Sequence, residues 1–422
     1  MLSLQLIREN KDFVLKGLRK KHFAAAEETI EKILLADQKR RDLQKQNDDA
    51  LSKVNTLSRQ IGMLMKSGKH AEAETIKAES TALRELSKSL HESLAATEME
   101  LQQLLVLLPN IPHADVPEGR HASDNVVVHQ WGDLPVLNEG AKPHWDLIKE
   151  YDIIDFELGN KVTGAGFPVY KGKGARLQRA LINFFLDEAI KAGYQEIQPP
   201  ILVNQESGFG TGQLPDKDGQ MYYANEDNLY LIPTAEVPIT NLYRDMILKP
   251  EDLPIKLAGY TPCFRREAGS WGAEVRGLNR LHQFDKVEIV QIVAPEESYN
   301  QLQEMVTHVK TLLEKMELPY RILKLCGGDM SFASALTYDF EVYSAAQQRW
   351  LEVSSVSNFE TFQANRMKLR YKVEGKTLLL HTLNGSALAL PRIVAALLEN
   401  NQTPNGIKLP EAIAEYAGFD MI

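Results

Sequence analysis

Charged and aromatic side chains that could bind a nucleotide are concentrated between Tyr260 and Val290. Two extended runs flank a loop there, which predicts a hairpin with a long tip. Because residues two apart in a strand share a face, Arg265 and Glu267 should point together, as should Phe284 and Glu288 on the returning strand. We therefore expect a guanidinium, carboxylates and an aromatic ring on one surface. The alternative is structural, a cross-strand salt bridge over a half-buried ring.

The common phosphate-binding motifs do not occur in this sequence. The hairpin tip contains three glycines, Gly269, Gly272 and Gly277. A Walker loop requires Gly-Lys followed by Ser or Thr, whereas Gly172-Lys173 is followed by Gly174. The third glycine of a dinucleotide fingerprint is also missing after Gly174. A nucleotide would therefore be bound by another arrangement, for which the hairpin is the candidate.

A further segment carries polar groups suited to a small substrate. Three short polar side chains share the parity of one extended run: Thr382, Asn384 and Ser386. One face of a strand could therefore present all three to the substrate.

With these residues in place, the sequence resembles bacterial-type seryl-tRNA synthetases. The segment from Phe264 through the glycine loop to Phe284 resembles motif 2 of that family, including Arg276-Gly277-Leu278 and His282-Gln283-Phe284. The segment 193–200 is similar to motif 1, the dimer-interface element of class II synthetases, and Thr234-Ala235-Glu236 resembles the serine-recognition triplet. The segment 381–386, followed by Arg392, resembles motif 3. The resemblance covers essentially the whole chain.

The resemblance implies ATP and Mg²⁺ as bound species and a role for each matched residue. Arg265 would hold the α-phosphate and the substrate carboxylate, Glu267 would read the adenine amino group and Phe284 would stack on the base. Arg265 and Arg392 are the expected catalytic residues, Arg392 through the γ-phosphate, and Glu352 with Ser355 would hold the magnesium ion. Glu352 and Ser355 differ in parity, so joint binding of the ion requires the strand to end or bulge near Ser354. The implied ATP site comprises Arg265, Arg266, Glu267, Leu281, Phe284, Glu352, Val353, Ser354, Ser355 and Arg392. Arg266 has the opposite parity and is expected to face away.

The implied substrate is L-serine, and Glu288 would take its amino and hydroxyl groups. The implied serine site comprises Thr234, Ala235, Glu236, Arg265, Glu288, Asn384 and Ser386. Serine and ATP would give seryl-adenylate and pyrophosphate, after which tRNA(Ser) accepts the seryl group. Whether tRNA(Sec) is also charged stays open. The alternative is a synthetase-like amino acid ligase that charges a carrier protein.

The element that precedes these motifs is a long helical hairpin. Residues 27–108 contain no proline and carry two apolar heptad seams separated by a turn near Gly68, which predicts an antiparallel coiled coil of two helices. At 1.5 Å per residue each helix would be about 60 Å long. Arg40 and Asn47 interrupt the first seam. Periodicity alone also fits an oligomerisation coil, whereas the resemblance implies a tRNA-binding arm.

The remaining chain predicts an α+β fold on an antiparallel sheet flanked by helices, because short extended runs occur in succession with helices at 174–192 and 296–316. We expect a tRNA-binding domain at 1–108 and a catalytic domain at 109–422, with a linker over 109–119. An alternating basic strip fits either a charged edge strand or an acceptor-stem contact. Its residues are Arg366, Lys368, Arg370 and Lys372.

Composition limits the remaining function classes. The chain has 422 residues, 44% hydrophobic and 25% charged, with a net charge of -9, which excludes a generally basic nucleic-acid coat protein. Its two cysteines, Cys263 and Cys326, are too few for a disulfide framework or a multi-thiolate zinc site. The sequence has no 18-residue apolar run and its first residues do not form a secretion signal. We expect a cytoplasmic protein without a membrane partner, and the resemblance implies a homodimer.

Overall fold

The computed structural model describes residues 1–216, 218–267 and 276–422. These residues form two compact units, Met1–Pro109 and Asn110–Ile422. Of the three glycines expected at the hairpin tip, Gly269 and Gly272 lie outside the described residues. No helix in the described part of the chain is long and apolar enough to cross a bilayer.

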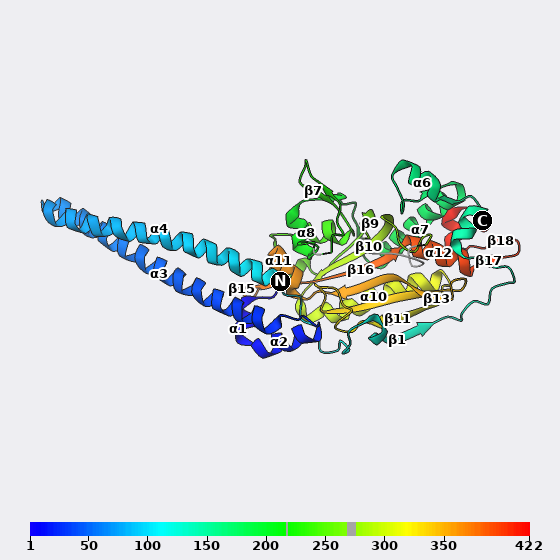
Figure 1. Ribbon diagram of the computed structural model, residues 1–422, viewed down its shortest axis with the longest axis horizontal. Coiled ribbons are helices and arrows are strands. Elements are labelled where there is room, and N and C mark those ends of the chain that lie inside the picture. Colours follow the sequence, from blue (N-terminus) through cyan, green and yellow to red (C-terminus); the bar gives the residue numbers. More distant parts are fainter. Residues whose placement is uncertain (217, 268–275) are drawn as a thin grey trace. The chain divides into compact units, whose positions relative to one another are not determined.

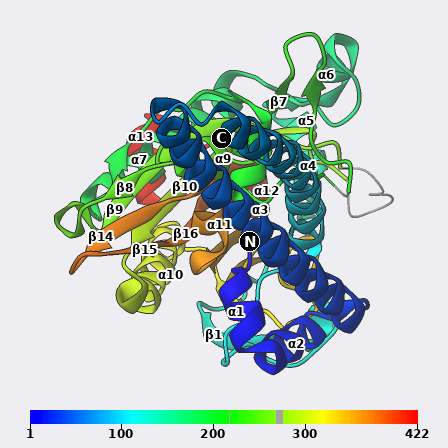
Figure 2. The ribbon, with the colours of Figure 1, turned by 90° about the vertical axis from the view of Figure 1, so that its left-hand side faces the viewer.

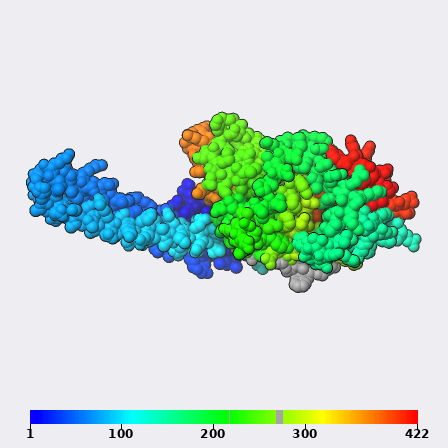
Figure 3. Space-filling model, turned by 90° about the horizontal axis from the view of Figure 1, so that it is seen from above, coloured from blue at the N-terminus to red at the C-terminus, as the bar shows by residue number. Residues whose placement is uncertain are grey.

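The first unit is helical, as the heptads predict. Helices α1 (Leu4–Glu9) and α2 (Lys11–Lys20) precede α3 (Ala26–Lys66) and α4 (His70–Leu107). The two long helices lie side by side and are joined by a short turn (Figures 1 and 3). Gly68 supplies the positive φ of 74° that this turn needs. The predicted helical hairpin is therefore confirmed.

Polar residues inside the coiled coil are paired within it. Asn47, at a seam position, is buried and its Oδ1 accepts a hydrogen bond from Ser87 Oγ on α4 at 2.7 Å. The other interruption, Arg40, turns back onto Asp37, whose side chain is only 1% exposed and also pairs with Arg8. Both interruptions thus satisfy buried polar groups, which would be costly to leave unpaired.

The second unit is built on a sheet in which, among the described residues, eight strands are paired in the order β1-β11-β12-β13-β16-β10-β9-β4. Neighbouring strands are antiparallel apart from the β4–β9 pair, so the expected antiparallel α+β fold is confirmed. In sheet order the strands are Val126–Trp131, Tyr320–Lys324, Leu336–Ser344, Arg349–Asn358, His381–Ala389, Gln283–Val293, Ile255–Phe264 and Gln195–Glu196.

Smaller strand groups and helices surround this sheet. The smaller strands are β2 (Ile154–Asp155) with β3 (Val169–Tyr170), β5 (Leu202–Val203), β6 (Tyr223–Ala224) and β7 (Leu229–Leu231), β8 (Ile247–Leu248), β14 (Arg370–Val373) and β15 (Lys376–Leu379), and β17 (Gln402–Thr403) with β18 (Gly406–Ile407). The helices are α5 (His144–Glu150), α6 (Phe156–Val162), α7 (Gly172–Lys191), α8 (Gln205–Thr211), α9 (Glu236–Asn241), α10 (Ser298–Lys315), α11 (Thr361–Met367), α12 (Leu390–Asn400) and α13 (Glu411–Ala417).

The two faces of the main sheet have different neighbours. Val287, Ile289 and Val293 of β10 enter the main core with residues of α7, α10 and α12. The ribbons of these helices are labelled beside the sheet in Figures 1 and 2. Val290 has the opposite parity, so it faces the other side of the sheet, where it packs with Ile239 of α9. Phe284 and Glu288 share the parity of Val290, so the face under α9 continues into the predicted site.

One expectation about this unit was wrong. The basic strip is not an edge strand, because β14 lies between β15 and β8, as Figure 2 shows, and Arg366 lies on α11. The expected linker over 109–119 is hydrogen-bonded to the second unit, where Asn110 Nδ2 donates to the carbonyls of Ala333 and Phe359.

Arg366 is only 7% exposed, so it cannot be part of an acceptor-stem contact at the surface. Its guanidinium lies 4.8 Å from the ring centroid of Phe209 and 5.0 Å from that of Phe362, and it donates to the carbonyls of Phe209 and Leu214. Burial lowers the pKa of Arg366 to about 10.

Candidate active site

The ends of β9 and β10 bring together the Arg265 guanidinium and the Phe284 ring, which the sequence predicts to share one surface. The two strands are antiparallel with Phe284 opposite Cys263, and the pairing continues as Arg265 N–H donates to His282 O at 2.9 Å. The Arg265 guanidinium lies 5.2 Å from the ring centroid of Phe284. Glu267 follows the strand and pairs with Arg280 at 2.8 Å, whereas Arg266 is exposed, as its parity predicts.

The two residues before the triplet Thr234–Glu236 bind to this hairpin. Phe264 N–H donates to Ile232 O at 2.8 Å, and Arg265 Nε donates to Pro233 O at 3.3 Å. Ala235 is fully buried and packs with Ile239, Leu257 and Val290. These contacts hold the start of the triplet beside the Arg265 guanidinium.

Glu288 is 2% exposed, and its carboxylate forms an ion pair with Lys286. The Lys286 ammonium lies 2.6 Å from Glu288 Oε2 and donates to Thr234 Oγ1 at 2.9 Å. Thr234 Oγ1 in turn donates to Glu288 Oε2 at 3.3 Å. Lys286 was not selected from the sequence, although its parity with Phe284 and Glu288 was a signal that could have found it.

Thr382, Asn384 and Ser386 lie on β16 beside β10, with Ser386 opposite Glu288. The three residues are buried, so a short polar face adjoins the Glu288 carboxylate as the parity predicts. Thr382 Oγ1 donates to Gln363 Oε1 at 2.6 Å. The Gln363 amide then donates to Glu236 Oε1, also at 2.6 Å. No local pattern marks Gln363, because its contacts come from distant parts of the chain.

Glu236 has a perturbed acidity that follows from this packing. Burial raises the pKa of Glu236 to about 7, and the nearby negative charge of Glu288 adds to the rise. The Gln363 hydrogen bond and the charges of Lys286 and Arg265 act in the opposite direction. The carboxyl group therefore changes protonation near neutral pH.

A β-bulge resolves the parity conflict between Glu352 and Ser355. Glu352 pairs with Glu341 and Ser354 pairs with Phe340, so Val353 is the extra residue of β13. The bulge moves Ser355 onto the face of Glu352. The sequence indicated that a strand end or bulge was needed near Ser354 but not which residue forms it. Ser354 is buried and its Oγ donates to Ser386 O at 2.6 Å, so it links two strands of the site.

Asp339 lies opposite Ser355 on β12 and extends this polar face. Burial raises the pKa of Asp339 well above its usual range, and the charge of Glu352 contributes further. Its Oδ1 is buried and has no hydrogen-bond partner among the described residues. Oxygen ligands of this kind suit Mg²⁺, which typically takes one or two protein carboxylates and keeps water or phosphate oxygens. A closed protein cage is not needed, and in the described ranges no three His, Cys, Asp or Glu side chains form one.

Arg392 connects α12 to both the hairpin and the bulged strand. Its Nε donates to Asn279 O at 3.0 Å and its Nη1 donates to Glu352 O at 2.6 Å. Leu281, two residues after Asn279, is 4% exposed and packs into the core. Guanidinium groups thus lie at two positions of the site, Arg265 and Arg392, where they can bind the oxygens of a polyphosphate bidentately.

Comparisons with known proteins identify the family. Residues 1–112 match the seryl-tRNA synthetase N-terminal domain, and residues 220–401 match the tRNA synthetase class II core domain (G, H, P, S and T). The serine–tRNA ligase of Salinibacter ruber is 51% identical over 425 residues, which cover 100% of this chain and 99% of the relative. The chain belongs to the seryl-tRNA synthetase family.

Two solved structures of family members extend this similarity to three dimensions. The seryl-tRNA synthetase of Pyrococcus horikoshii, crystallised with ATP, has a TM-score of 0.94 and 31% identity, covering 100% of this chain and 99% of that one. The cytoplasmic enzyme of Naegleria fowleri, crystallised with AMP, has a TM-score of 0.88 and 25% identity, with 100% and 98% covered. The family's N-terminal domain falls on the helical unit, and the class II core includes the β9–β10 hairpin, β13, β16 and α12.

Proposed function

We propose that this chain is a serine–tRNA ligase that activates L-serine with ATP and transfers the seryl group to tRNA(Ser). Membership of the seryl-tRNA synthetase family supports the reaction. The observation that carries the assignment to this site is the shared surface of Arg265, Phe284, Glu288 and the short polar side chains of β16.

In the proposed nucleotide site, Phe284 stacks on adenine and Glu267 accepts from its amino group. Arg265 binds the α-phosphate and the serine carboxylate, and Arg392 binds the γ-phosphate. The distance of 5.2 Å between Arg265 and the Phe284 ring supports a site that spans base and phosphate. Exposed Arg266 borders the site, and Leu281 is assigned a backbone contact because its side chain is buried.

The proposed serine site lies between Thr234–Glu236 and β16. Glu288 takes the serine ammonium and hydroxyl groups, assisted by Glu236, Asn384 and Ser386. A substrate without the hydroxyl would leave these buried polar groups unpaired, which can discriminate by about 10⁴-fold. Threonine would instead be excluded by size.

The residues around the bulge of β13 fit a magnesium ion. Glu352 and Ser355 would hold it, and the buried Asp339 Oδ1 without a partner among the described residues is consistent with a cation nearby. When bound, the ion would neutralise phosphate charge. Val353 and Ser354 contribute by setting the bulge and tying it to β16.

In the proposed reaction the protein positions anionic reactants, and no side chain acts as a covalent nucleophile. In the first step, the serine carboxylate attacks the α-phosphorus of ATP in line, and pyrophosphate leaves. Arg265 and Arg392 would hold the two reacting ends together and offset the charge that accumulates. In the second step, the 3′-terminal hydroxyl of the tRNA takes the acyl group and AMP leaves.

We assign tRNA binding to residues 1–108 and aminoacylation to 109–422. The long α3–α4 coiled coil supports the first assignment, because a rigid arm can recognise the shape of an RNA. Free, buried Cys263 and Cys326 fit the reducing cytoplasm, where we place the protein.

We further propose that the chain acts as a homodimer. Strand β1 is an edge strand of the main sheet, and Val126, Val127 and Val128 are each nearly half exposed, at 45%, 48% and 46%. An exposed apolar edge favours pairing with another chain. The 193–200 segment includes β4 at the opposite edge.

The decisive experiment is ATP–pyrophosphate exchange with each of the twenty amino acids, followed by charging of tRNA(Ser). We expect exchange with serine only and seryl transfer to the tRNA. Exchange with another amino acid instead of serine would refute the assignment. The carrier-protein alternative is not favoured, because the family model and the full-length relatives are tRNA synthetases, and labelling of a carrier fraction instead of tRNA would revive it.

A further inference from the structure

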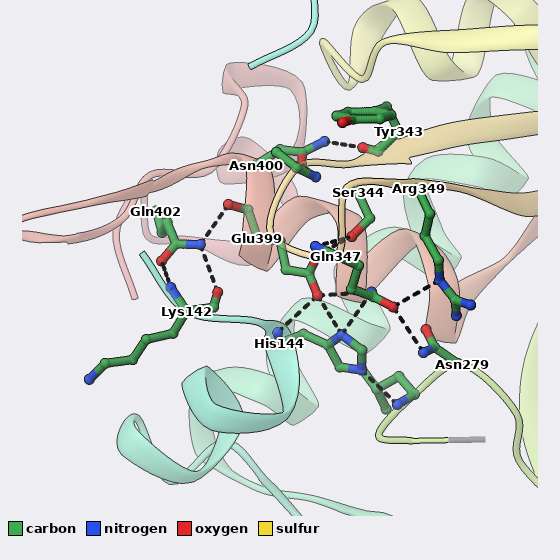
Figure 4. Close-up of polar contacts among 12 residues, drawn as sticks. Lys142, His144, Asn279, Tyr343, Ser344, Gln347, Arg349, Glu399, Asn400 and Gln402 are labelled. Carbon is green, nitrogen blue, oxygen red and sulfur yellow. Dashed lines mark hydrogen bonds and ion pairs between the residues drawn. The ribbon is translucent and has the colours of Figure 1, made fainter. Parts of the chain in front are cut away.

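A fully buried histidine outside the proposed substrate contacts holds the returning end of the β9–β10 hairpin (Figure 4). His144 is the first residue of α5, and its Nε2 accepts the backbone N–H of Leu278 at 2.9 Å. Its Nδ1 lies 2.6 Å from Oε1 of Glu399 on α12. Because the nitrogen that accepts a backbone N–H must carry a lone pair, the ring proton is on Nδ1 and is donated to Glu399.

Glu399 binds this imidazole as an ionised carboxylate, which its other hydrogen bonds stabilise. Its Oε1 also accepts the His144 backbone N–H at 2.9 Å and the Gln347 amide at 3.0 Å, and its Oε2 accepts the Ser344 hydroxyl. Burial alone would raise the pKa of Glu399, but hydrogen bonds from His144 and Ser344 outweigh burial and lower it. A carboxylate in this position fixes the tautomer and the orientation of the ring.

Each residue of the segment 277–279 is restrained by a close contact or a hydrogen bond. Gly277 has a φ of 64°, and a Cβ there would lie 2.3 Å from His144 Nε2, so a side chain cannot be accommodated. Leu278 is held through its N–H by His144. Asn279 is held through its side chain, which donates to Gln347 Oε1 at 3.1 Å.

The same segment directs a proposed catalytic guanidinium. Asn279 O accepts from Arg392 Nε at 3.0 Å. Arg392 and Glu399 are both on α12, seven residues and about two turns apart, so they lie on the same side of the helix. The helix therefore contacts the hairpin return twice, directly through Arg392 and through the His144 ring held by Glu399.

We propose that His144, oriented by Glu399, is a positioning residue for ATP in the first step of the reaction. It acts through Leu278 and Asn279 on Arg392. The inference rests on the proposed function, and it adds a residue 248 positions away from Arg392 in the sequence. If the Leu278 contact is lost, the Asn279 carbonyl shifts and the guanidinium loses its alignment with the phosphates.

Substitutions at His144 can separate its two hydrogen bonds. His144→Asn can still donate at the position of Nδ1 but cannot reach Leu278, and His144→Phe makes neither bond. His144→Gln places an amide oxygen near the position of Nε2, where it can accept from Leu278. We expect the KM for ATP in pyrophosphate exchange to rise about tenfold in the Asn and Phe variants, as for the loss of one buried hydrogen bond, and less than threefold in the Gln variant.

Further readouts distinguish positioning from a purely structural role. The KM for serine should change less than threefold, and in an Arg392→Ala background His144→Asn should add less than twofold to the loss of ATP affinity measured by calorimetry. His308→Gln is the matched control, because His308 is also buried and lies on α10, and burial lowers its pKa to about 4. It should leave the KM for ATP unchanged.

The outcomes against the proposal are distinct from those against the function. An unchanged KM for ATP in folded Asn and Phe variants, or an equal rise in Asn and Gln with a lower Tm in both, would overturn it. If the Phe variant does not fold, the Asn and Gln variants still decide, because they differ by one methylene. Absence of serine-dependent exchange in the unaltered protein would refute the function, whereas the order of ATP affinities by calorimetry would still test His144.

Discussion

At the scale of single residues, the proposed site combines guanidinium groups, which can bind anions, with buried carboxylates, which can bind a cationic amino group. Arg265 contacts the Phe284 ring and the Pro233 carbonyl, so its orientation is set from two sides. Glu288 is balanced by Lys286 and Thr234. Arg265 is only partly buried, so its substitution should change binding and rate without unfolding the chain, whereas removal of Lys286 or Glu288 would leave a buried charge unpaired.

Arg265→Ala should reduce serine-dependent pyrophosphate exchange by about 10²-fold or more, because a positioned charge that stabilises the reacting phosphate is lost. Arg265→Lys should recover only part of the rate, since an ammonium cannot bind two oxygens in a planar fork. Circular dichroism and Tm should match the unaltered protein. Retained exchange in the Ala variant would remove Arg265 from the mechanism.

Serine binding should depend on pH through Glu236. The pKa of Glu236 is about 7, so the group is mostly a carboxylate above that pH and mostly protonated below it. The charged groups facing it are Glu288, Lys286 and Arg265. Because serine binds with a positive ammonium group, the KM for serine should rise as pH falls from 8 to 6.

Glu236→Gln is the control for this pH effect. It should have a higher KM for serine at pH 8 and lose most of the dependence between pH 6 and 8. The KM for ATP, measured in parallel, should vary less over this range. A serine KM with the same pH profile in both proteins would assign the titration to another group.

At the scale of elements, the sequence predicted what local periodicity encodes. Heptads placed α3 and α4, and strand parity put Phe284 and Glu288 on one face. The need for a bulge near Ser354 was also evident, but only the pairing of β13 with β12 shows that Val353 is the extra residue.

The remaining features depend on contacts between distant segments. Gln363 and His144 acquire their roles from partners on other elements, which no local pattern records. Arg366 looked like part of an alternating strand because α11 is short and leads directly into β14. Its burial among aromatic rings is a tertiary effect that overrides the alternating pattern.

The distal half of the coiled coil should be needed for charging and not for activation. Replacing residues 51–86 by a short glycine-rich turn keeps the Asn47–Ser87 pair and the base of both helices. Serine-dependent exchange should stay within twofold, because the site lies in the second unit. Aminoacylation of tRNA(Ser) should fall at least tenfold. Full charging by the shortened protein would leave the arm an oligomerisation device.

At the scale of the whole molecule, a net charge of -9 is compatible with a tRNA partner that is selected by shape. Acidic charge lowers indiscriminate attraction to nucleic acid, because non-specific affinity depends on the number of neutralised phosphates. Recognition by the proposed tRNA-binding arm would then depend on local contacts and on the geometry of the coiled coil.

The proposed dimer can be tested at edge strand β1. Light scattering should give about twice the chain mass of 47.5 kDa. Val127→Glu should shift the population toward monomer, because a charge would be buried without a partner. Val136→Glu is the matched control, since Val136 is 97% exposed and its side chain buries almost no surface. A mass of one chain for the unaltered protein would contradict the dimer.

The Asn47–Ser87 hydrogen bond fixes the register of the two helices in the coiled coil. It fixes which turns of α3 and α4 face each other, so the arm cannot slide by a turn without leaving a buried amide unpaired. Matched removal of one heptad from each helix would shorten the arm by about 10 Å and keep its orientation. Removal of four residues would instead rotate the tip. The length of the arm and the rotational phase of its tip are therefore separate variables, and matched removal of whole heptads changes the length alone.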